Sequence, residues 1–157
     1  MGTREGLIRV PDKSGESSAP AGKAYTAPGI DVWFDATRCV HFAECVRGLP
    51  DVFQPGRKPW VRPDLDDPNE VARVVRRCPT GALHYRLEDG PDEEAKVPTT
   101  VHRLSTGPLR LRGDLLIQTP AGVVRDTRAV LCGCRMTANE PFCDGRCEIN
   151  QRLAERD

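Results

Sequence analysis

The chain has 157 residues, of which 38% are hydrophobic and 29% are charged, a size and composition that fit one ordinary domain or two small ones and exclude a large multidomain enzyme. Because 23 Lys and Arg side chains balance 23 Asp and Glu, the overall charge gives no reason to expect nucleic acid or an anionic membrane surface as a partner. With 14 glycines, 14 prolines and 5% aromatic residues, the chain should be rich in turns, so its seven cysteines are the candidates for holding it together.

The first 28 residues are rich in Pro, Gly, Ser, Ala and Lys and lack apolar periodicity, which predicts a flexible arm or a loosely docked strand. They contain no apolar run of the signal-peptide type, and no run in the chain approaches the roughly 20 residues that span a bilayer. An odd number of cysteines in two groups favours metal chemistry over a secreted disulfide framework. We therefore expect a soluble, cytoplasmic protein without a membrane partner.

The next elements surround the first three cysteines. Alternating apolar residues over 30–34 predict a strand that leads into Cys39. Asp67, Pro68 and Glu70 form a helix-start signature, and the apolar spacing that follows predicts a helix with Cys78 on its apolar face. A strand over 82–87 and an acidic linker over 91–99 should follow.

The remainder of the chain reads as three strands followed by a cysteine-rich loop. The strands are expected over 100–104, 109–118 and 123–131, with Gly- and Pro-containing turns between them. The last strand leads into Cys132, and residues 148–157 form a short polar segment with helical character.

Three cysteines make up the first candidate metal site. Cys39 and Cys45 lie close together on one loop, and Cys78, followed by proline, supplies a third thiolate. Bacterial ferredoxin clusters use a C-x2-C-x2-C run with a distant Cys-Pro, and Phe42 stands here in place of the middle cysteine. Three thiolates suit a 3Fe-4S cluster, whereas a 4Fe-4S cluster needs a fourth ligand, for which His41 is a candidate. The alternatives are three thiols that only pack in a core, and a zinc site.

The stretch from about Val32 to Tyr85 contains the runs CVHFAECVRGLPDVF, KPW and RCPTGAL, and it resembles the divergent single-cluster bacterial ferredoxins. This resemblance implies a ferredoxin-like domain over residues 29–90. It also implies that Cys39, Cys45 and Cys78 are the cluster ligands, and that a segment over 52–60 crosses beside the cluster.

The second candidate site consists of four cysteines close in the sequence, namely Cys132, Cys134, Cys143 and Cys147. Four thiolates are enough for a 2Fe-2S cluster, with two on each iron. Asp144 and Gly145 permit a tight turn whose backbone amides point toward a negatively charged cluster. A zinc site is the alternative interpretation.

The run CGCRMTANEPFCDGRC resembles the CDGSH iron-sulfur domains of the mitoNEET type. The matching positions are Cys132, Cys134, Thr137, Pro141, Cys143, Asp144 and Gly145. Arg146 replaces the small residue of the motif, and Cys147 replaces its histidine ligand. The resemblance implies a 2Fe-2S cluster, a CDGSH-type domain over residues 100–157, and a capacity to form homodimers. Since a thiolate is anionic where imidazole is neutral, Cys147 predicts a lower reduction potential and a cluster that is less labile in acid.

These elements predict an α+β protein with a ferredoxin-like N-terminal domain and a small β-rich C-terminal domain. The two sites use all seven cysteines, and no nucleophile, carboxylate pair or phosphate-binding loop accompanies them, so we expect no catalytic residues and no enzyme. The expected function is electron transport, with single electrons passing between a reductase and an acceptor enzyme. The alternative is an iron-sulfur redox sensor or a cluster storage and transfer protein.

Overall fold

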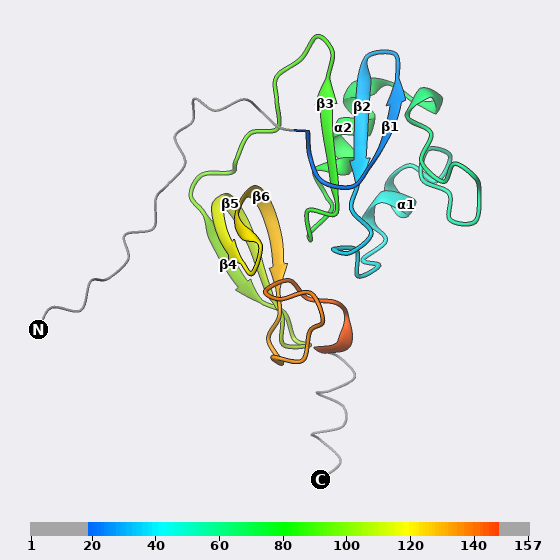
Figure 1. The fold of residues 1–157 in the computed structure, drawn as a ribbon. Helices are drawn as coiled ribbons and strands as arrows, with labels where there is room; N and C mark the ends of the chain where they lie inside the picture. The colour runs from blue at the N-terminus through cyan, green and yellow to red at the C-terminus, as the bar shows by residue number, and fades with distance from the viewer. Residues whose placement is uncertain (1–18, 148–157) are drawn as a thin grey trace, which may run out of the picture.

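The computed structural model describes residues 19–147 and shows a mostly β protein with two small helices (Figure 1). Two antiparallel sheets of three strands each form two small domains. The expected α+β class is therefore met only in part, because the helices are short: α1 spans Glu44–Gly48 and α2 spans Pro68–Val75. The helical character expected over residues 148–157 lies outside the described residues.

The N-terminal sheet has the strand order β1-β2-β3, formed by Lys23–Ala27, Ile30–Phe34 and Leu83–Leu87. The central strand β2 has the bounds that the alternating pattern predicts. Strand β1 belongs to the stretch expected as a flexible arm or loosely docked strand, and the structure pairs it with β2 along its whole length. The ordered domain thus begins before residue 29, while residues 1–18 lie outside the described residues.

Helix α2 packs on this sheet and begins as its sequence predicts. The side chain of Asp67 accepts a hydrogen bond from the backbone N–H of Asn69 at 2.9 Å, which caps the first turn. The helix ends at Val75, so Cys78 lies in the turn after the helix and not on its apolar face. The buried core between α2 and the sheet consists of Ile30, Val32, Val52, Phe53, Val61, Val71, Val74, Val75, Leu83 and neighbouring side chains.

The C-terminal sheet has the order β4-β5-β6, formed by Thr100–Arg103, Leu109–Thr119 and Gly122–Leu131. All three strands follow the predicted pattern to within one residue at each end. Its own apolar core is small and consists of Leu115, Ile117, Ala129 and Phe142. Strand β6 leads directly into Cys132. In the described part of the chain, no helix has the length and apolar character that crossing a membrane requires.

A buried arginine joins the two sheets. Arg128 of β6 is 2% exposed, and its guanidinium donates to the backbone carbonyls of Val75 at 2.6 Å and Cys78 at 2.8 Å. It also donates to the carbonyl of Leu83 at 2.8 Å and forms a two-pronged pair with the carboxylate of Glu93. A charge removed from water in this way is tolerated only when it is paired and fully hydrogen-bonded. Arg128 therefore holds the C-terminal sheet against the end of α2.

A second buried cation extends the contact. Arg38, which follows β2, pairs with Asp126 of β6 at 2.5 Å and donates to the carbonyl of Thr80 at 2.7 Å. His84 of β3 lies between the carboxylates of Asp126, at 3.4 Å, and Glu93, at 3.3 Å. The interface between the two domains is thus a continuous polar network that spans both sheets and the linker.

Replacing Arg128 by methionine should destabilise the protein by about 3–5 kcal/mol, because Glu93 and three carbonyls would remain buried without their donor. The matched control is Arg125→Met on the same strand, since Arg125 pairs with Asp114 at the surface and should contribute at most about 1 kcal/mol. Denaturant unfolding followed by circular dichroism measures both. Equal losses in the two variants would contradict the role given to Arg128.

Stability should also fall at alkaline pH through His84. Burial lowers the pKa of His84, but its hydrogen bonds with Asp126 and Glu93 outweigh burial and raise the pKa from 6.5 to about 9. Because the folded pKa is the higher one, the stabilisation is complete below about pH 6.5 and is lost as pH rises through about 9. The free energy of unfolding should fall by up to roughly 3 kcal/mol over this pH range.

The free energy of unfolding measured between pH 6 and 10 tests this expectation. His84→Gln should flatten the alkaline fall, whereas His102→Gln, at an exposed position on β4, should leave it unchanged. The explanation is wrong if the fall persists in full in His84→Gln.

Candidate metal centres

The three cysteines of the first site come from three different elements. Cys39 lies on the loop after β2, Cys45 lies in the first turn of α1, and Cys78 lies in the turn after α2. All three line one pocket, together with His41 and Phe42. The structure thus brings together every residue that the sequence proposes for this site.

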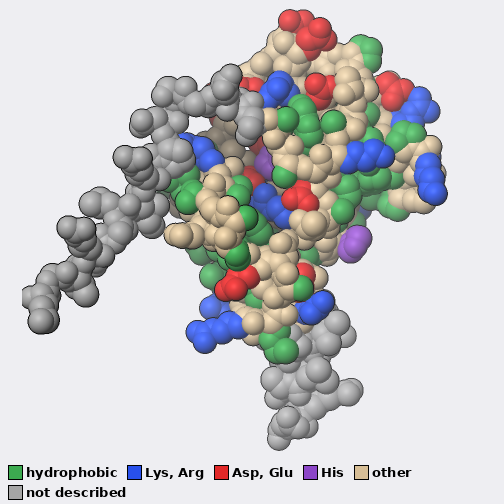
Figure 2. All heavy atoms as spheres, in the orientation of Figure 1, with side chains coloured by type: hydrophobic (Ala, Val, Ile, Leu, Met, Phe, Trp, Pro, Cys, Tyr) green, Lys and Arg blue, Asp and Glu red, His purple; other side chains and the backbone are tan. Residues whose placement is uncertain are grey.

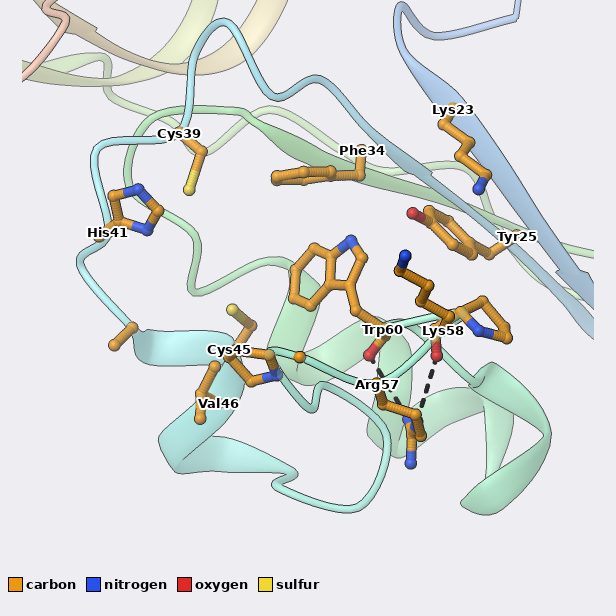
Figure 3. Close-up of a pocket in the computed structure, with 14 residues that line it drawn as sticks. Lys23, Tyr25, Phe34, Cys39, His41, Cys45, Val46, Arg57, Lys58 and Trp60 are labelled. Carbon is orange, nitrogen blue, oxygen red and sulfur yellow. Dashed lines mark hydrogen bonds between the residues drawn. The ribbon is translucent and has the colours of Figure 1, made fainter.

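The loop between Cys39 and Cys45 is bent by two residues with left-handed backbone conformations, His41 at φ 61° and Ala43 at φ 60°. Such conformations are uncommon for residues other than glycine and often occur at functional sites. The bend leaves Cys39, His41 and Cys45 facing one hollow, with the ring of Trp60 across from them (Figure 3).

The pKa values of the three thiols indicate that this site needs a cation to hold them ionised. Burial raises the pKa of Cys39, and burial followed by the nearby Cys78 raises that of Cys45 to about 11. Burial raises the pKa of Cys78 as well, but a hydrogen bond with Thr80 at 3.5 Å and the charge of Arg128 outweigh it and lower the pKa. Three thiolates therefore gather here only if a bound metal supplies positive charge, and its binding releases protons.

Aromatic and basic side chains complete the hollow, which has a volume of about 880 Å³. Trp60 packs edge-on against Phe34 with ring centroids 4.7 Å apart, in agreement with the expectation that the segment over 52–60 passes beside the site. Lys23 and Lys58 lie on the far side of Trp60 from the cysteines (Figure 3). Lys23 is not among the residues that the sequence predicts near this site, because the composition of residues 1–28 predicts an arm or a loosely docked strand. The Tyr-Thr pair within KAYTA is the local signal for a strand there.

The four cysteines of the second site lie on the loop that follows β6. The Cys132 sulfur lies 3.7 Å from that of Cys134 and 3.9 Å from that of Cys147, and the sulfurs of Cys143 and Cys147 are 3.8 Å apart. Cys143 and Cys147 are each 3% exposed. These separations suit tetrahedral thiolate ligation, as at each iron of a cluster or at zinc.

The remaining motif residues shape this loop. The hydroxyl of Thr137 donates to the carbonyl of Phe142 at 2.7 Å, and the carboxylate of Asp144 accepts from the backbone N–H of Ala138 at 3.0 Å. Gly145, at φ 88°, turns its N–H toward the Cys143 sulfur at 3.4 Å. An amide directed at a ligand sulfur is the arrangement expected from the Asp-Gly pair, and it favours negative charge there.

Burial raises the pKa of Cys147 to about 12, so this thiol too needs a metal to remain ionised. In residues 19–147, the Nε of Arg38, the residue before Cys39, is buried without a hydrogen-bond acceptor. At the second site the sulfurs of Cys132, Cys134 and Cys147 all lie within 4.8 Å of one another. Four thiols on one loop, and three thiols with a histidine in one pocket, fit iron-sulfur clusters.

Comparison with known proteins agrees with this geometry. Residues 25–88 match the family described as divergent 4Fe-4S mono-cluster, and residues 106–146 match the iron-binding zinc finger of CDGSH type. The Uncharacterized protein YjdI of Escherichia coli, in strain K12 and in O157:H7, is 45% identical over 64 residues, which is 41% of this chain and 84% of that protein. No solved structure matches.

The two matches cover the two groups of cysteines, and neither belongs to an enzyme family. The chain is therefore an iron-sulfur binding protein that belongs to the divergent 4Fe-4S mono-cluster family and carries a CDGSH-type iron-binding domain after it.

Proposed function

We propose that this protein carries single electrons between a reductase and an acceptor enzyme, using one cluster in each domain. The observation that supports this function is the distribution of its cysteines: all seven are unpaired by disulfides, three line one pocket and four converge in one loop. None remains to act as a nucleophile or resolving thiol. Bound clusters would supply one-electron uptake and release, and the protein would supply ligands, charge and exclusion of water.

At the first site, Cys39, Cys45 and Cys78 would hold a 4Fe-4S cluster, and His41 would be its fourth ligand. The match to a 4Fe-4S family and the position of His41 in the same pocket as the three thiols support this assignment. A 3Fe-4S cluster held by the three cysteines alone is the alternative.

At the second site, Cys132, Cys134, Cys143 and Cys147 would hold a 2Fe-2S cluster with two thiolates on each iron. Cys147 stands where the CDGSH motif has a histidine. Its thiolate adds negative charge to the site, which lowers the reduction potential, and it has no neutral nitrogen that can be protonated near neutral pH.

Partner docking is proposed at the hollow over the first site. Lys23, Arg57 and Lys58 border it, so an acidic face of a redox partner would be complementary to it. Acidic and basic side chains are interspersed over the face drawn in Figure 2. Attraction of a partner would therefore depend on the basic side chains beside the hollow and not on the net charge of the protein. We place the protein in the cytoplasm, where thiols stay reduced.

A second candidate function is a redox sensor or a cluster storage and transfer protein. The exposure of His41 favours it, because a cluster held by an imidazole open to solvent is lost when that imidazole is protonated. Rapid loss of the first cluster in acid, abolished in His41→Cys, would support this candidate over the electron carrier.

Iron and acid-labile sulfide measured on anaerobically purified protein test the cluster assignment. We expect about six irons per chain, from 4Fe-4S plus 2Fe-2S, and no EPR signal before reduction by dithionite. His41→Ala should lower the content to about five irons and give an oxidised signal typical of 3Fe-4S. Five irons in the unmodified protein would instead support the three-cysteine cluster, and a colourless protein with zinc would refute both.

The residue at position 147 should set the properties of the second cluster. Cys147→His should raise its midpoint potential and speed its loss in acid, because a neutral, protonatable ligand replaces a thiolate. EPR-monitored redox titration and absorbance decay at low pH measure the two effects. Met136→Ala, a neutral truncation of an exposed side chain in the same loop, should change neither. The argument fails if the unmodified protein has the more positive potential and the faster iron loss.

A further inference from the structure

The two cysteine sites lie against each other, although they belong to different domains. The loop after β2 passes beside the loop after β6 (Figure 1). Arg38, next to Cys39, places its guanidinium carbon 4.3 Å from the ring centre of Phe142, which is next to Cys143. Residues adjacent to candidate ligands of one site thus touch residues adjacent to candidate ligands of the other.

Two further contacts lie beside this one. The side chain of Val40 comes within 3.9 Å of the position that a Cβ on Gly145 would occupy, so the two loop backbones approach closely. The side-chain amide of Asn139 donates to the carbonyl of Thr37 at 2.8 Å. Residues 37, 38 and 40 of the first loop therefore all contact the second loop.

Phe42 belongs to both sites. Its side chain lines the pocket that contains Cys39, Cys45 and Cys78. It also packs against the buried cluster formed by Val130, Cys143 and Cys147, whose members are 2–3% exposed. The partly buried Phe42 side chain thus contacts the surroundings of both sets of thiols.

The buried polar network keeps this separation constant. Arg128, four residues before Cys132, donates to the carbonyl of Cys78 at 2.8 Å. The pair between Arg38 and Asp126 ties the residue before Cys39 to β6. Because both ties are buried and hydrogen-bonded on several sides, the two domains cannot move apart without leaving charges unpaired.

We propose that the two clusters of one chain exchange electrons directly, across the layer formed by Val40, Phe42 and Phe142. This inference rests on the proposed function, since it requires a cluster at each site. An external one-electron reductant would donate at the first site, where the hollow opens. The electron would then be shared between the two sites according to their potentials, the cluster that gives it up being oxidised by one and the cluster that takes it up being reduced by one. No bond forms or breaks, and no proton moves.

The test uses the full-length protein with both clusters bound. Flash photoreduction injects single electrons, and absorption follows their redistribution between the clusters. We expect a first-order rate that does not change with protein concentration. We also expect the EPR spectrum of the fully reduced protein to show spin-spin broadening. This broadening should be absent from the spectra of the double variants Cys39→Ala/Cys45→Ala and Cys143→Ala/Cys147→Ala, in which too few ligands remain to hold one of the clusters.

Substitutions in the layer between the sites test whether electrons pass through Phe42. Phe42→Ala should slow the redistribution several-fold and keep both clusters, because it opens the layer between the sites. Met136→Ala is the control, a truncation of an exposed apolar side chain in the second-site loop, and should leave the rate unchanged. An unchanged rate in Phe42→Ala would overturn the assignment of Phe42. If that variant does not fold, the concentration dependence and EPR broadening of the unmodified protein still decide the proposal.

The outcomes separate this inference from the proposed function. Suppose that the protein holds about six irons per chain, but that the redistribution rate rises in proportion to protein concentration and the EPR spectrum is the simple sum of the spectra of the single-site variants. That result would overturn direct exchange and leave the carrier function standing. Failure of either site to bind a cluster would overturn both.

Discussion

The buried guanidinium of Arg128 is the contact on which the arrangement of this protein depends. Two sheets of three strands have little apolar surface to share, and the C-terminal core contains only a few side chains. The domains therefore meet through charge, with Arg128 bonded to carbonyls at the end of α2 and to Glu93 of the linker. Since a buried cation is tolerated only with all its partners in place, this contact permits one relative orientation.

That orientation places the two cysteine sites side by side. Arg128 holds the turn that carries Cys78, and Arg38 holds the start of the loop that carries Cys39. The charge of Arg128 also lowers the pKa of Cys78. This residue thus serves both the structure of the interface and the electrostatics of the first site.

Metal binding and folding should be coupled in this chain. The hollow beside Trp60 is large, and burial raises the pKa values of its two thiols, Cys39 and Cys45. Without a cation, the site is therefore a poorly filled cavity in which these two ligands are protonated. The cysteine loop after β6 has few apolar contacts of its own. A bound group would add stabilisation to both regions, in a chain rich in Gly and Pro and poor in aromatic residues.

Local patterns in the sequence determined the elements and the candidate ligands. The alternation over 30–34, the Asp-Pro start of α2 and the strands before Cys132 were predictable because each depends on neighbours within a few residues. The cysteine spacings, which are also local patterns, identified the two sites and both families. The assignment of individual cysteines as ligands stays a prediction. Only the tertiary structure revealed β1 as a strand, the network around Arg128 and the contact through Phe42. The network around Arg128 depends on partners 35 to 90 residues apart in the chain, and a charged residue within a strand carries no local sign of the buried partner that it will meet.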